Sequence, residues 1–101
     1  MNDLTISSDE LRAILTSRPN SIFLLDVREP EEFEEEKIEG CTLIPLGDLM
    51  ARANEMPKDQ DIIVYCAHGV RSMHALMGLK SLGYDRVKSL TGGICDYYGH
   101  D

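Results

Sequence analysis

One cysteine, Cys66, stands between an apolar run and a segment of helical periodicity, where its thiolate could act as a nucleophile. The run before it, Ile62-Ile63-Val64-Tyr65, is typical of a buried strand. The short segment Ala67-His68-Gly69-Val70-Arg71 follows, and from Ser72 apolar residues recur at helical spacing as far as Gly83. Open α/β sheets bind ligands where the carboxyl end of a strand meets the amino end of a helix, so Cys66 is the candidate catalytic residue.

The surroundings of Cys66 favour a thiolate. Backbone N–H groups of a short curled loop stabilise an anion, and the amino end of the following helix adds its dipole. Arg71 brings a permanent positive charge and His68 a conditional one. The candidate substrate-binding residues are therefore those of the loop and the helix start: Ala67, His68, Gly69, Val70, Arg71 and Ser72. An inert buried cysteine is the alternative, and the glycine, the arginine and the helix start argue against it.

Four segments of the chain resemble a rhodanese domain. The first is the active loop and following helix, Cys66-Ala67-His68-Gly69-Val70-Arg71-Ser72 with Gly83-Tyr84. The other three fall in the family's order: 26–33 (DVREPEEF), 38–46 (IEGCTLIPL) and 92–97 (GGICDY). Together they cover nearly the whole chain. The resemblance implies a single-domain sulfurtransferase that carries sulfane sulfur as a persulfide on Cys66.

The mechanism that this resemblance implies is a double displacement. Cys66 takes the outer sulfur of thiosulfate, a polysulfide or a persulfide, and a thiol, a protein thiol or cyanide then accepts it. The loop N–H groups stabilise the terminal sulfur in the manner of an oxyanion hole, and Arg71 binds an anionic donor. The reaction requires no metal and no organic cofactor.

Two other functions remain as alternatives. Cysteine phosphatases and arsenate reductases place five residues between the cysteine and the arginine, whereas four residues, Ala67 to Val70, separate Cys66 from Arg71. The shorter loop predicts a cradle for one sulfur atom rather than for a phosphoryl group. Rhodanese-like domains also serve as non-catalytic binding modules, although these often lack the cysteine.

Composition limits the partners and the compartment. The 101 residues predict one domain, 1–101, and 18 acidic against 10 basic residues give a net charge of −8. A chain this acidic is not attracted to nucleic acid or to anionic membranes. It has no apolar stretch that could span a bilayer, and the start MNDLTISSDEL has no signal pattern. An odd number of cysteines without zinc-site spacing favours a reduced, cytoplasmic protein.

Strand and helix patterns alternate along the chain. This alternation predicts an α/β fold with a mainly parallel sheet and helices on both faces, and the resemblance implies the five-stranded, doubly wound rhodanese-like form. The strands are expected at 4–6, 21–27, 42–44, 62–65 and 86–90. Ser7 and Glu10 predict a capping box at the start of the first helix.

Two further groups of residues lie near the expected site. Asp26 and Arg28 follow the second strand, where an ion pair or hydrogen bonds that support the Cys66 loop are favoured over direct catalysis. Seven glutamates lie between Glu29 and Glu39, and they predict a solvated helix face rather than a docking site for a basic partner.

The remaining cysteines and methionines have open roles. Cys95 is interpreted as a small core residue rather than a resolving thiol for Cys66, and the sequence around Cys41 offers no anion-stabilising setting. Core packing is favoured over a partner-docking patch for the methionines Met50, Met56, Met73 and Met77.

Overall fold

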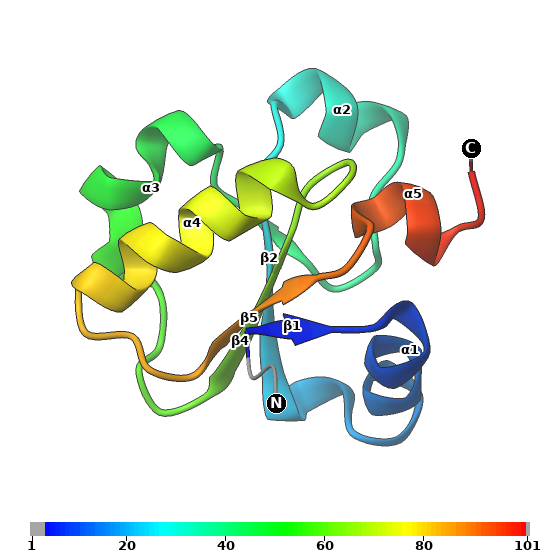
Figure 1. Cartoon of the computed structure of the whole chain (residues 1–101), viewed down its shortest axis with the longest axis horizontal. Coiled ribbons are helices and arrows are strands. Elements are labelled where there is room, and N and C mark those ends of the chain that lie inside the picture. The colour runs from blue at the N-terminus through cyan, green and yellow to red at the C-terminus, as the bar shows by residue number, and fades with distance from the viewer. Residues whose placement is uncertain (1–3, 101) are drawn as a thin grey trace.

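The computed structural model describes residues 4–100 and contains one five-stranded sheet with the order β1-β5-β4-β2-β3. The strands are β1 (Thr5–Ile6), β2 (Ile22–Asp26), β3 (Thr42–Leu43), β4 (Asp61–Tyr65) and β5 (Val87–Leu90). Each neighbouring pair is parallel. The predicted α/β fold is therefore confirmed, and all carboxyl ends of the strands lie at one edge of the sheet (Figure 1).

Helices cover both faces of this sheet (Figure 1). The elements are α1 (Ser8–Ser17), η1 (Pro19–Ser21), α2 (Pro30–Glu35), α3 (Leu46–Arg52), η2 (Ala53–Glu55), α4 (Val70–Ser81) and α5 (Gly93–Tyr97). The helices α3 and α4 lie on one face, and α1 and α5 lie on the other. Within residues 4–100 no helix is long and apolar enough to cross a membrane.

Alternation along the strands builds a separate core on each face. In β4, Ile62 and Val64 pack toward Leu76 of α4, whereas Ile63 and Tyr65 pack toward Leu11 of α1. All six side chains are buried. Strands covered on both faces need continuous apolar runs, which explains why β4 contains no alternating polar residue. The two cores hold β4 rigidly, and Cys66 follows directly from its end.

The helix signals in the sequence are largely confirmed. The Ser7 hydroxyl accepts a hydrogen bond from the Glu10 N–H at 3.1 Å, and the Glu10 carboxylate accepts one from the Ser7 N–H at 3.0 Å, which is the predicted capping box. In α4 the predicted stripe of Ser72, Ala75, Leu76 and Leu79 is buried. Leu82 does not belong to this stripe, because the helix ends at Ser81 and Leu82 is 40% exposed.

Candidate active site

Cys66 lies at the carboxyl end of the central strand β4 and is only 1% exposed. Its sulfur accepts hydrogen bonds from the backbone N–H groups of Gly69 at 3.1 Å and Ser72 at 3.3 Å. Gly69 adopts φ +103°, which turns the chain back over the sulfur and starts α4 at Val70. The structure thus brings Cys66, Gly69 and Ser72 together as a cradle for a negatively charged sulfur.

The hydroxyl groups of Ser72 and Ser89 are buried and form a chain of hydrogen bonds that begins at the Cys66 sulfur. The Ser72 Oγ lies 3.6 Å from the Cys66 Sγ and 2.6 Å from the Ser89 Oγ. The thiol can donate to Ser72, which then donates to Ser89. In the thiolate state both hydrogen bonds can reverse their direction, so that Ser89 donates to Ser72 and Ser72 donates to the sulfur. Sequence reasoning did not identify Ser89. The pattern that could have indicated it is a polar residue at a buried position of strand β5.

The amino end of α5 supports the loop from the other side. The Ile94 N–H donates to the Cys66 carbonyl at 2.9 Å, and the Cys95 N–H donates to the Ala67 carbonyl at 3.1 Å. Gly93 has φ +63°, and a Cβ at this position would overlap the carbonyl oxygens of Cys66 and Ala67. The Gly-Gly pair is therefore more than the expected turn: Gly93 lets the α5 backbone approach the loop.

Cys95 is near the site through its backbone, as its position in the sequence suggests. Its side chain is half-buried, and the cysteines Cys41, Cys66 and Cys95 are all free thiols. Cys95 is therefore not the buried core residue expected from the sequence, and the expectation that it does not act as a resolving thiol for Cys66 stays a prediction.

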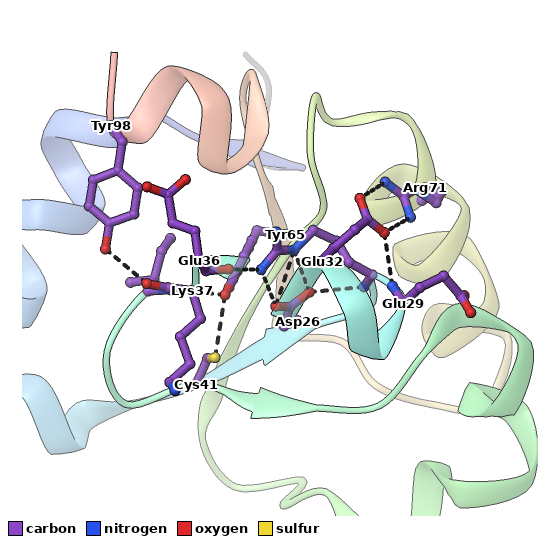
Figure 2. Close-up of polar contacts among 11 residues, drawn as sticks. Asp26, Glu29, Glu32, Glu36, Lys37, Cys41, Tyr65, Arg71 and Tyr98 are labelled. Atoms are coloured by element: carbon purple, nitrogen blue, oxygen red, sulfur yellow. Dashed lines mark hydrogen bonds and ion pairs between the residues drawn. The ribbon is translucent and has the colours of Figure 1, made fainter. Parts of the chain in front are cut away.

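The Arg71 guanidinium is held by Glu32 of α2. The Arg71 Nη1 and Nη2 atoms lie 2.8 and 2.9 Å from the two Glu32 carboxylate oxygens (Figure 2). These hydrogen bonds from Arg71 lower the pKa of Glu32 to about 2. The interpretation of this acidic segment as a solvated face is correct for the exposed Glu31 but wrong for Glu32. The role of Arg71 as a donor-binding residue stays a prediction.

Asp26 and Arg28 form the ion pair that the sequence suggested. The pair is fully buried: the Asp26 carboxylate accepts hydrogen bonds from the Arg28 N–H at 2.9 Å and from its Nη2 at 2.8 Å. The same Nη2 donates to the Glu36 carbonyl at 2.6 Å (Figure 2). The pair therefore fixes the turn after β2 and the end of α2. The Arg28 guanidinium also lies 5.5 Å from the ring centre of Tyr65, the residue before Cys66.

Cys41 occupies a setting unlike that of Cys66. It accepts a hydrogen bond from the Tyr65 hydroxyl at 3.3 Å, and that hydroxyl accepts one from the Ile38 N–H at 3.1 Å (Figure 2). Burial raises the pKa of the Cys41 thiol. A raised pKa disfavours the thiolate form, so this setting does not favour Cys41 as a nucleophile.

The methionines divide between core and surface. Met56 is buried at 4% exposure, as predicted, but Met50 and Met77 are 55% and 61% exposed, so core packing is wrong for these two. Met50 and Met77 lie on the outward sides of α3 and α4, because leucines and alanines occupy the inward positions of both helices.

The fold and the site together define an α/β protein in which backbone N–H groups bind a buried cysteine sulfur at the carboxyl edge of a parallel sheet. The model of the rhodanese-like domain matches residues 7–100, and the chain belongs to this family. The family that the sequence motifs indicated is therefore confirmed.

Three known proteins illustrate the relationship. A sulfurtransferase of Allochromatium vinosum is 37% identical over 79 residues, which are 78% of this chain and 74% of the relative. A thiosulfate sulfurtransferase of Coxiella burnetii is 29% identical over 83 residues, or 82% of this chain and 78% of the relative. The crystal structure of a rhodanese-related protein from Thermoplasma volcanium has a TM-score of 0.85 at 29% identity, covering 97% of this chain and 95% of that one.

Proposed function

We propose that this protein is a sulfurtransferase that carries sulfane sulfur as a persulfide on Cys66. The observation that carries the proposal is the pair of N–H groups, from Gly69 and Ser72, that donate to the buried Cys66 sulfur. The first turn of a helix leaves further N–H groups without intrahelical acceptors, and in α4 these belong to the same loop. A persulfide places its negative charge on the terminal sulfur, which such a cradle stabilises.

The first half-reaction transfers one sulfur to Cys66. The thiolate attacks the outer sulfur of thiosulfate, a new S–S bond forms, and the S–S bond of the donor breaks to release sulfite with both bonding electrons. A polysulfide or a low-molecular-weight persulfide reacts in the same way and releases a shorter polysulfide or a thiolate. In the second half-reaction a thiolate, a protein thiol or cyanide attacks the outer sulfur and regenerates the Cys66 thiolate.

Two alternatives are less well supported. The spacing of four residues between Cys66 and Arg71 is one shorter than in a cysteine phosphatase, and the Arg71 guanidinium is already paired with Glu32. A non-catalytic binding module would not need the cysteine or its two N–H donors. As part of the proposal we place the protein in the cytoplasm, because three free cysteines suit a reducing compartment.

The test is to detect the persulfide. After treatment with thiosulfate, mass spectrometry of the intact protein and of the Cys66 peptide should show the added mass of one sulfur atom, and cyanide should remove it as thiocyanate. Cys66→Ser should take up no sulfur and remain folded by circular dichroism. Cys95→Ala is the matched control and should retain most of the transfer. Full activity in Cys66→Ser would contradict the mechanism.

A further inference from the structure

Glu32 neutralises the loop's one permanently charged side chain. Arg71 uses two of its nitrogens in hydrogen bonds of 2.8 and 2.9 Å to Glu32, and both side chains are about one-third exposed at 35% and 31%. Arg71 is the second residue of α4, and the next residue, Ser72, donates its N–H to the Cys66 sulfur. A cation beside the sulfur-binding loop is therefore already paired with an anion.

The Glu32 carboxylate is held in place by its own helix as well as by Arg71. Glu32 is the third residue of α2, and its Oε1 accepts a hydrogen bond from the Glu29 N–H at 2.9 Å (Figure 2). The Glu29 side chain in turn accepts a hydrogen bond from the Glu32 N–H, completing a capping box. A donor that binds Arg71 must therefore displace a carboxylate that the helix end positions independently.

We propose that Glu32 is a specificity residue that selects sulfur donors by charge: it disfavours dianionic thiosulfate relative to donors with one negative charge or none. The loop N–H groups suffice for one negative charge on the transferred sulfur. The second charge of thiosulfate, on the sulfonate end, would meet the Glu32 carboxylate and a cation already neutralised by it. The proposal rests on the sulfurtransferase function above.

Two donors separate charge from chemistry. Thiosulfate carries two negative charges, and the methanethiosulfonate anion, CH3SO2S⁻, carries one. In both, the Cys66 thiolate bonds to the outer sulfur as the S–S bond breaks, and the electron pair leaves with sulfite or with methanesulfinate. The comparison is the ratio of kcat/KM for thiosulfate to kcat/KM for methanethiosulfonate, with cyanide as acceptor at low ionic strength.

The variant is Glu32→Gln, because glutamine preserves the length of the side chain and can still complete the capping box. We expect the ratio to rise about two- to fivefold in favour of thiosulfate, the range for one partly exposed charge interaction. Glu31→Gln is the matched control. It removes the same charge from the preceding, exposed position of α2, and the ratio of kcat/KM values should change by less than about 1.5-fold.

A second readout does not need turnover. Sulfate, a dianion, should protect Cys66 from iodoacetamide at a lower concentration in Glu32→Gln than in the wild type. If neither donor loads Cys66 with sulfur, the proposed function fails and the protection assay still tests the charge selection. If both donors load Cys66 but the ratio in Glu32→Gln stays within about 1.5-fold of the wild type, or Glu31→Gln has the same effect, the charge selection is overturned and the sulfurtransferase function stands.

Discussion

The polar contacts of the Cys66 sulfur come from residues close to it in the chain. Two backbone N–H groups donate to the sulfur, and the Ser72 hydroxyl lies 3.6 Å from it and can act as acceptor or donor. Hydrogen bonds to a charged group are stronger than those to a neutral one, so a hydroxyl that donates would stabilise a sulfur carrying negative charge. Ser89 supplies the buried hydroxyl that lets Ser72 reverse without losing a partner.

Ser72→Ala should therefore slow the alkylation of Cys66. The variant keeps both N–H donors and removes the hydroxyl, so the rate of reaction with iodoacetamide at neutral pH should fall about two- to tenfold, the effect of one hydrogen bond. Ser72→Thr keeps a hydroxyl at the same position, and its rate should stay within about twofold of the wild type. An unchanged rate in Ser72→Ala would show that the hydroxyl pair has no influence on the sulfur.

At this scale the sequence identifies the residues of one segment and misses their partners. Cys66, Gly69 and Ser72 are close in the chain, so their spacing alone indicated a loop around a sulfur. Ser89 and Glu32 reach the loop from other elements, β5 and α2. Their contacts depend on strand register and on the angle of a short helix, neither of which is encoded in local periodicity.

At the scale of elements, the site is a junction of β4, α4 and α5. The Cys66 loop joins the first two, and the α5 N–H groups of Ile94 and Cys95 bind its carbonyl groups. Gly93 makes this contact possible, because the two backbones approach too closely for a side chain. Gly99 also has a positive φ, of +74°, but a Cβ there would meet nothing within 4 Å.

The two glycines separate backbone strain from steric overlap. Gly99→Ala should lower the free energy of unfolding by about 1 kcal/mol, because only the left-handed conformation is strained. Gly93→Ala adds overlap with the loop and should lower it by about 1–3 kcal/mol more. Urea unfolding measures both, and only Gly93→Ala should reduce sulfur transfer per folded molecule. Equal losses of stability in the two variants would contradict the close approach.

The elements themselves were the most predictable part of the molecule. Apolar runs and helical stripes are local patterns, so all five strands and the capping box at Ser7 were found in place. The errors came where the tertiary structure decides exposure. Leu82 lies beyond the end of α4, and Met50 and Met77 face outward because leucines and alanines already fill the inward positions.

For the whole molecule, with its net charge of −8, stability at low pH depends on which acids are paired. The pKa of Glu32 is about 2 in the folded protein, against an ordinary value of 4.5. A lowered pKa means that the folded state favours the charged form. The stabilisation from Glu32 is therefore fully present above pH 4.5 and is lost as the pH falls toward 2.

Glu32→Gln should reveal this dependence. The variant should unfold at a lower urea concentration than the wild type at pH 7, and the difference should shrink between pH 4.5 and pH 2, where the wild-type carboxylate becomes protonated. The exposed Glu31→Gln should show no such change with pH. A difference that is constant down to pH 2 would mean that Glu32 contributes through shape alone.

The connection between Cys66 and α5 has a consequence for biosynthesis. The sheet places β5 between β1 and β4, and the loop carbonyls bind N–H groups of residues 94 and 95. On the ribosome, Cys66 leaves the exit tunnel before these partners do. The nascent chain therefore holds a cysteine whose loop is not yet braced, and these contacts can form only after residues 94 and 95 have left the tunnel.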